Sequence, residues 1–139
     1  MKNQTGVKKE DLFMKGNQSI RVIIIDDIDH VRHDLKMALE LIENIKVIGE
    51  AGDGETAVKL VEKLKPDIVL MDLKMPGMTG FEAASKIHKL TDTCTLVALT
   101  LYDGEEIRLQ AAESGFKAFI VKGTPLKHLV ETIQNLVKQ

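Results

Sequence analysis

Short runs of apolar residues alternate along the chain with segments in which apolar residues recur every three or four positions. An uninterrupted apolar run indicates a strand buried on both faces of a parallel sheet, whereas the wider spacing is typical of an amphipathic helix. Five strands are predicted, each followed by a helix, and the fourth helix has the weakest pattern. The strands are expected at residues 20–25, 47–51, 68–71, 95–100 and 118–121, and the helices at residues 30–42, 57–64, 81–90, 107–112 and 126–137.

Strict alternation of strands and helices predicts an α/β fold with a doubly wound, five-stranded parallel sheet. Five strands suit the flavodoxin-like order 2-1-3-4-5, with helices on both faces of the sheet. The chain has 139 residues, so residues 20–139 are expected to form one domain. Residues 1–19 are polar with few groups able to pack, and we interpret them as a flexible N-terminal extension.

The composition is that of an ordinary globular protein, with 44% hydrophobic and 29% charged residues. The formal net charge of -2 favours neither a nucleic acid nor a membrane surface as partner. Apolar runs are too short for a membrane-spanning helix, so we expect no membrane contact. Cys94 is the single cysteine, which excludes an internal disulfide and fits a cytoplasmic location. We expect Cys94 to be a structural residue where a strand begins.

Four of the five predicted strands end in polar side chains that can do chemistry. The residues are Asp26, Asp27, Asp72, Thr100 and Lys122. Because parallel strands end at the same edge of a sheet, and because these four strands are neighbours in the predicted order, the side chains are expected to converge on one crevice. Each residue alone could be a helix cap, a turn former or a solvated loop residue. Their joint placement favours a site.

Three carboxylates in one crevice repel each other unless a cation lies between them. Mg²⁺ prefers oxygen ligands, commonly one or two carboxylates together with water and phosphate oxygens. Lys122 and Thr100 would add an ammonium and a hydroxyl, both of which donate hydrogen bonds to phosphate. A carboxylate nucleophile, a magnesium ion, a lysine and a hydroxyl are the parts of an aspartyl-phosphate site.

From about residue 20 to its end, the chain resembles the receiver domain of bacterial two-component response regulators. The resemblance rests on the acidic pair Asp26-Asp27, on Thr100, on Lys122, and on the segment Met71-Asp72-Leu73-Lys74-Met75-Pro76-Gly77-Met78-Thr79-Gly80. It implies that Asp72 accepts a phosphoryl group from a sensor histidine kinase, in a reaction that requires Mg²⁺.

The resemblance also implies roles for the other residues. Asp27 and Asp72 would bind Mg²⁺ directly, Asp26 would help through water, and Lys74 would offer its backbone carbonyl. Lys122 would pair with the phosphoryl group. Thr100 and Phe119 would form the switch pair that reports phosphorylation. Such a protein phosphorylates itself and slowly loses the group, so no turnover of an external substrate is expected.

Two positions depart from the common pattern of the family. Gly123 rather than proline follows Lys122, and the segment Lys122-Gly123-Thr124-Pro125 resembles the branch with LuxR-type DNA-binding output domains. We therefore expect a transcriptional regulator that contacts DNA only through an output domain absent from this chain, and that forms a homodimer on phosphorylation. Leu101 stands where a small residue is usual, and we hypothesise that its bulk slows dephosphorylation.

Two alternatives remain open. The segment Asp27-Ile28-Asp29-His30-Val31 fits the nucleophile motif of haloacid-dehalogenase-like phosphatases, with Thr100 and Lys122 as further motifs. That interpretation lacks an acidic metal motif after Lys122 and gives Asp72 no role. A degenerate receiver used only for docking is the second alternative, and it is disfavoured because every phosphorylation residue is present.

Overall fold

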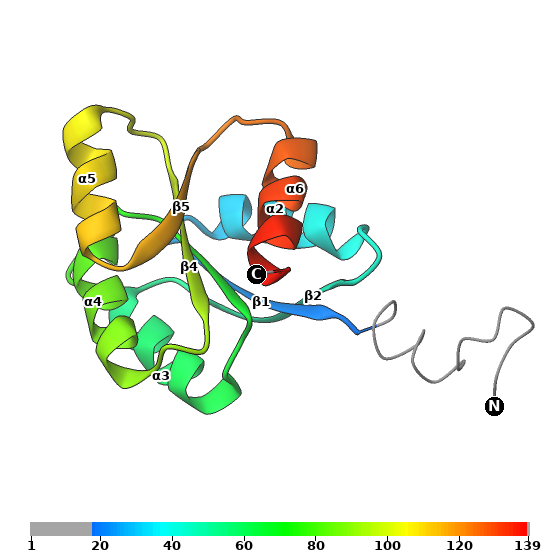
Figure 1. The fold of residues 1–139 in the computed structure, drawn as a ribbon, viewed down its shortest axis with the longest axis horizontal. Helices are drawn as coiled ribbons and strands as arrows, with labels where there is room; N and C mark the ends of the chain where they lie inside the picture. Colours follow the sequence, from blue (N-terminus) through cyan, green and yellow to red (C-terminus); the bar gives the residue numbers. More distant parts are fainter. Residues whose placement is uncertain (1–17, 139) are drawn as a thin grey trace, which may run out of the picture.

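The computed structural model describes residues 18–138, in which strands and helices alternate as predicted (Figure 1). The proposed N-terminal extension lies, up to residue 17, outside the described residues. The elements are β1 (Ile20–Ile25), α2 (Asp29–Glu40), β2 (Ile45–Ala51), α3 (Gly54–Leu64), β3 (Ile68–Met71), α4 (Gly80–Leu90), β4 (Thr95–Thr100), α5 (Glu105–Glu113), β5 (Phe116–Val121) and α6 (Leu126–Val137).

All paired strands are parallel, and their order is β2-β1-β3-β4-β5. Both the α/β class and the predicted order are therefore confirmed. Helices α2 and α6 cover one face of the sheet, while α3, α4 and α5 cover the other (Figure 1). This arrangement places the carboxyl ends of all five strands along one edge.

The core consists of two layers, one on each face of the sheet. Along β1, Val22 and Ile24 pack toward α2 and α6, whereas Ile23 and Ile25 pack toward α3 and α4. This alternation follows from the two-residue repeat of a strand. Every residue of β3 has 0% exposed surface, because β3 is the central strand and both of its faces are covered. Asp72 directly follows this strand and is itself buried, with 6% of its surface exposed.

Local sequence signals set where two helices begin. Thr79 and Glu82 form a reciprocal capping box at the start of α4. The side chain of Asp53 accepts a hydrogen bond from the backbone of Thr56, so α3 begins at Gly54, three residues before the predicted start. These caps fix the helices that flank the loop after β3.

The structure differs from the prediction made from the hydrophobic pattern in α5 and β5. Leu109 lies within the helix predicted at residues 107–112 but is 63% exposed, and Ala111 is the buried residue of α5. β5 begins at Phe116, two residues earlier than predicted, because pairing with β4 extends to that residue. Cys94 directly precedes β4 and packs against the core, which confirms its expected position.

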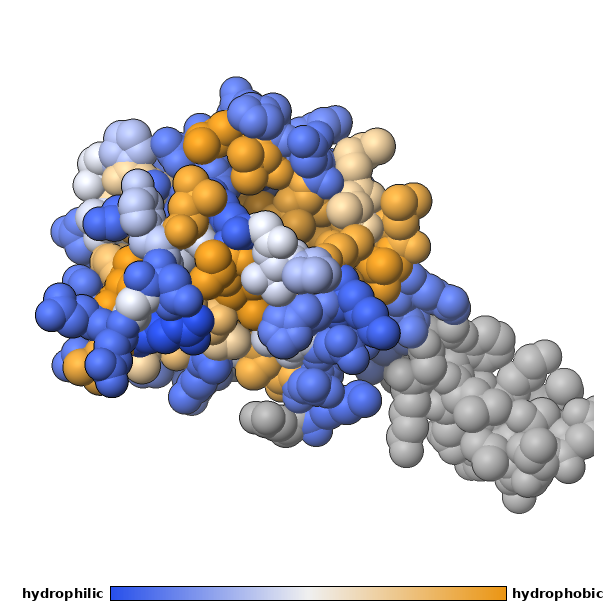
Figure 2. All heavy atoms as spheres, turned by 90° about the horizontal axis from the view of Figure 1, so that it is seen from above, coloured by the Kyte–Doolittle hydropathy of each residue, from blue (hydrophilic) through white to orange (hydrophobic). Residues whose placement is uncertain are grey.

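Figure 2 shows the molecule from above, relative to the view of Figure 1. In this view, hydrophobic residues gather over the side of the molecule where α2 and α6 lie. Met37 on α2 and Leu41 directly after it are 56% and 86% exposed, and Val137 on α6 is 40% exposed. Within residues 18–138, no helix combines the length and apolar character needed to cross a bilayer.

Candidate functional site

Backbone hydrogen bonds continue past the strand ends and hold the predicted site residues at one edge of the sheet. The N–H of Asp72 donates to the carbonyl of Ile25 at 2.9 Å, and the N–H of Asp26 donates to Ala51 at 3.1 Å. On the other side, the N–H of Lys122 donates to the carbonyl of Thr100 at 2.7 Å. The sheet itself therefore brings the four strand ends together, as the sequence indicated.

The three predicted acidic residues form a cluster. Asp26 and Asp72 are buried, while Asp27 is exposed. One carboxylate oxygen from each of them lies within 4.8 Å of the others. Oxygen donors at this spacing, two of them shielded from water and one open to it, suit a hard divalent cation such as Mg²⁺, which keeps some of its waters. The donor set therefore fits the metal that the sequence implied.

Lys122 occupies the centre of this cluster. Its Nζ donates to Oδ2 of Asp26 at 2.6 Å and to Oδ2 of Asp72 at 3.1 Å. The lysine side chain is 12% exposed, so Lys122 is not the solvated loop residue that the sequence alone allowed. Burial alone would lower the pKa of Lys122, but the hydrogen bond to Asp26 and the charge of Asp72 outweigh it and raise the pKa. The lysine therefore stays cationic.

Asp72 is held from both sides. Its Oδ1 accepts a hydrogen bond from the N–H of Lys74 at 3.1 Å, and its Oδ2 faces Lys122. Burial raises the pKa of Asp72, and the Lys74 and Lys122 contacts offset this only in part. A poorly solvated carboxylate with a fixed orientation is well suited to attack an electrophile. Binding of Mg²⁺ by the backbone carbonyl of Lys74 stays a prediction.

The loop after Asp72 depends on Gly80. A Cβ atom at Gly80 would lie 2.2 Å from the backbone oxygen of Asp72 and 2.7 Å from Cα of Leu73. The N–H of Gly80 also donates to the carbonyl of Leu73 at 3.0 Å. Helix α4 can therefore begin directly against the backbone of Asp72 only because residue 80 has no side chain.

Thr100 and Phe119 lie on neighbouring strands, β4 and β5. Thr100 is fully buried, and its Oγ1 accepts a hydrogen bond from the N–H of Tyr102 at 3.3 Å. Phe119 is partly buried, and the guanidinium of Arg108 lies 4.6 Å from its ring centroid. Arg108 also pairs with Asp103 at 2.6 Å.

Arg32 and Tyr102 contact residues of the site and were not identified from the sequence. Arg32 of α2 donates hydrogen bonds to the backbone carbonyl of Asp26 and to Glu50 of β2. The Lys74 ammonium lies 5.5 Å from the ring centroid of Tyr102. Arg32 could have been noticed as a charged residue next to the apolar stripe of its helix. Nothing in the sequence pairs Lys74 with Tyr102.

The phosphatase alternative needs Asp29 beside Asp27. Asp29 instead is 92% exposed at its side chain and pairs with Arg32 at 2.7 Å. In residues 18–138, the group of acids close enough to share a metal ion is Asp26, Asp27 and Asp72, without Asp29. The geometry therefore favours Asp72 over Asp27 as the nucleophile.

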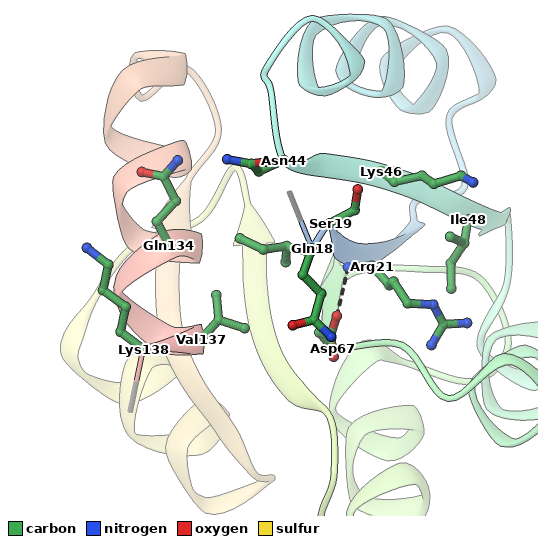
Figure 3. Close-up of a pocket in the computed structure, with 11 residues that line it drawn as sticks. Gln18, Ser19, Arg21, Asn44, Lys46, Ile48, Asp67, Gln134, Val137 and Lys138 are labelled. Carbon is green, nitrogen blue, oxygen red and sulfur yellow. Dashed lines mark hydrogen bonds between the residues drawn. The ribbon is translucent and has the colours of Figure 1, made fainter. Parts of the chain in front are cut away.

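A hollow of about 980 Å³ lies at the opposite edge of the sheet (Figure 3). The N–H of Arg21 donates to Asp67 there at 2.8 Å, and its guanidinium donates to the carbonyls of Leu64 and Lys65. None of the residues predicted for chemistry lines this hollow. It is lined by Gln18, Ser19, Ile20, Arg21, Asn44, Lys46, Ile48, Asp67, Gln134, Val137 and Lys138.

Comparison with known proteins shows the family to which this domain belongs. Residues 22–134 match the model of the response regulator receiver domain. The chain is 37% identical over 118 residues to the transcriptional regulatory protein YdfI of Bacillus subtilis, and 35% identical over 117 residues to the response regulator GacA of Pseudomonas aeruginosa. The alignments cover 85% and 84% of this chain but 55% of each relative, so the chain spans about half their length.

Two solved structures are also similar. One is a two-component response regulator of the LuxR family from Aurantimonas, with a TM-score of 0.83, 29% identity and coverage of 87% of this chain and 86% of that one. The other is the response regulator domain of Thermotoga maritima CheB, with a TM-score of 0.79, 30% identity and coverage of 85% and 96%. With its fold, its clustered strand-end residues and these matches, the chain belongs to the family of response regulator receiver domains of two-component systems.

Proposed function

We propose that this domain is a phosphorylation-activated signalling receiver in which Asp72 accepts a phosphoryl group in a Mg²⁺-dependent reaction. Receiver domains are signalling proteins rather than enzymes that turn over an external substrate, and they bind Mg²⁺ at an acidic pocket. The single observation that carries the proposal is the contact of Lys122 with both Asp26 and Asp72 inside the carboxylate cluster.

In the proposed reaction, an oxygen of Asp72 attacks the phosphorus of a phosphohistidine. The new O–P bond forms as the P–N bond breaks, and the leaving imidazole keeps the bonding electron pair and takes up a proton. Lys122 stabilises the charge that accumulates on the phosphoryl oxygens, and the N–H of Lys74 keeps the nucleophile oriented. Bound Mg²⁺ would neutralise part of the same charge, held by Asp27 and Asp72, with Asp26 acting through water and Lys74 through its carbonyl.

The phosphorylated state would be reported by Thr100 and Phe119. Thr100 stands at the end of β4, where its hydroxyl could exchange the N–H of Tyr102 for a phosphoryl oxygen. Phe119 would then leave Arg108 and pack inward on the neighbouring strand. Such a change alters the surface formed by α5 and β5, which is how a local charge event reaches a partner.

The relatives named above support proposals about partners. The phosphoryl donor would be a sensor histidine kinase in the cytoplasm, and the domain would regulate transcription through an output domain such as the relatives' additional length could contain. We also propose that a homodimer forms on phosphorylation, through the surface of α5 and β5 that would change in that state. Light scattering of the free and phosphorylated protein tests it, and a monomer in both states would contradict it.

The chemistry is tested by incubating the protein with Mg²⁺ and acetyl phosphate, followed by intact mass measurement. The wild type should gain one phosphoryl group that hydroxylamine removes, and omission of Mg²⁺ should prevent the gain. Asp72→Asn should gain none, whereas Asp92→Asn, which alters an exposed acid outside the cluster, should behave as the wild type. An unmodified wild type with several donors, or full modification of Asp72→Asn, would contradict the proposal.

A further inference from the structure

Arg32 is a half-buried residue of α2 whose side chain joins three parts of the chain. Its side chain is 15% exposed. Nη1 donates to the backbone carbonyl of Asp26 at the end of β1, Nε donates to Oε1 of Glu50 on β2 at 3.0 Å, and Nη2 donates to Oδ1 of Asp29 at 2.7 Å. A guanidinium is planar and presents its donors at fixed angles, so these contacts define one orientation.

The carbonyl that Arg32 contacts belongs to the peptide unit between Asp26 and Asp27. Fixing this oxygen fixes the plane of the peptide and therefore the direction in which Asp27 leaves the strand. Asp26 has further anchors of its own, since its N–H donates to Ala51 and its carboxylate accepts from Ile28 and Lys122. Asp27 is exposed, and no hydrogen bond of its side chain is found in residues 18–138. Its position therefore depends on the backbone.

We infer that Arg32 is a positioning residue of the metal site, which orients Asp27 through the Asp26 carbonyl and ties that orientation to β2 through Glu50. This inference rests on the proposed function, because it assumes that Asp27 and Asp72 bind Mg²⁺. Partners in the second layer around a metal commonly change its affinity about ten-fold or more when they are removed.

The direction in which the Kd for Mg²⁺ changes distinguishes a positioning role of Arg32 from the effect of a simple surface charge. A guanidinium near the carboxylate cluster repels Mg²⁺, so loss of the charge alone would tighten Mg²⁺ binding. Loss of the carbonyl contact frees the Asp26–Asp27 peptide and would weaken binding. Arg32→Lys keeps the charge but has one ammonium instead of a planar fork, so any loss of affinity in this variant reflects lost geometry.

Lys36 offers a matched control. It lies one turn further along α2 and also pairs with Glu50, at 3.3 Å, but no hydrogen bond or ion pair between it and Asp26 is found in residues 18–138. Lys36→Ala therefore removes a cation and a Glu50 partner without touching the peptide before Asp27. If Arg32 acts through that peptide, Mg²⁺ binding should weaken in Arg32→Ala but not in Lys36→Ala.

The experiment is calorimetric titration of the unphosphorylated protein with Mg²⁺. The Kd should rise about ten-fold in Arg32→Ala, several-fold in Arg32→Lys, and stay the same or fall in Lys36→Ala. In metal-free protein, the Asp27 backbone amide resonance should move in Arg32→Lys and not in Lys36→Ala. If Arg32→Ala does not fold, the Kd of Arg32→Lys for Mg²⁺ tests the inference on its own.

An unchanged or lower Kd in Arg32→Lys, with Mg²⁺ binding intact in the wild type, would overturn the role of Arg32 alone. A wild type that binds no Mg²⁺ would overturn the metal site of the proposed function, and this inference with it.

Discussion

Lys122 and Asp26 are separated by 96 positions in the chain, yet the lysine Nζ lies 2.6 Å from the aspartate Oδ2. The lysine also contacts Asp72, so one ammonium shares two carboxylates that a divalent cation would share too. Lysine and metal therefore compete for the same negative charge before phosphorylation, and both favour the charge of a bound phosphoryl group afterwards.

Lys122→Met should separate these two effects. Mg²⁺ should bind several-fold more tightly because a competing cation is gone, while phosphorylation by acetyl phosphate should become slower because the incoming phosphoryl oxygens lose a counter-charge. Metal titration and the initial rate of mass gain measure the two changes. Lys127→Met, at an exposed position of α6, should change neither. Weaker Mg²⁺ binding in Lys122→Met would contradict the competition.

Asp72→Asn should make the metal-free fold more stable near neutral pH. Burial raises the pKa of Asp72 above its ordinary value of 3.8, so the ionised side chain costs the folded state free energy at higher pH. That cost vanishes as the pH falls through the folded pKa and below 3.8, where both states are protonated. Urea unfolding at several pH values should show the gain near neutrality and its loss in acid.

The capping carboxylate Glu82 gives the opposite sign and serves as the control. Its hydrogen bonds with Thr79 lower the pKa of Glu82 below its ordinary value of 4.5. The stability that it contributes is therefore present above 4.5 and is lost as the pH falls through the folded pKa. Glu82→Gln should destabilise near neutrality, and less so in acid. The same sign for both variants would mean that desolvation does not govern Asp72.

Gly80→Ala should destabilise the fold by about 3 kcal/mol, because the added methyl would collide with the backbone of Asp72 and Leu73, which cannot move without disturbing the sheet. Gly77→Ala is the comparison, since that site is open but has φ +76, and it should cost about 1 kcal/mol through backbone strain. Urea unfolding measures both. Equal costs would show that the contact with the Asp72 backbone can relax.

Leu101→Ala should shorten the lifetime of the phosphorylated protein. Leu101 directly follows Thr100 and is 65% exposed, so its side chain stands at the surface beside the site, where it can hinder water. Leu109→Ala, at a position of α5 that is 63% exposed, is the matched control. Decay of the intact phosphoprotein mass after donor removal gives both half-lives. No difference between them would refute the hypothesis.

The sequence was sufficient to predict which residues meet, because parallel strands share an edge and the strand ends can be read from the apolar runs. It was not sufficient to predict how they meet. The register between β1 and β2 shifts after Val22, and that between β4 and β5 shifts after Leu96. Such shifts set side-chain directions without leaving a periodic signal. The contact of Arg32 with Glu50 reaches from α2 to β2, while Lys74 and Tyr102 lie in the loops after β3 and β4, where no hydrophobic period applies.

The hollow at the edge opposite Asp72 is lined by both ends of the described chain, at Gln18 and Lys138. A polypeptide joined to either end would therefore leave from the side of the sheet where no phosphoryl chemistry is proposed. The same domain could thus be grafted onto unrelated sequences without rebuilding its reactive edge. A conformational change at the reactive edge would reach such a neighbour only along the length of a strand or helix. These elements would therefore couple the phosphorylation site to the attached polypeptide.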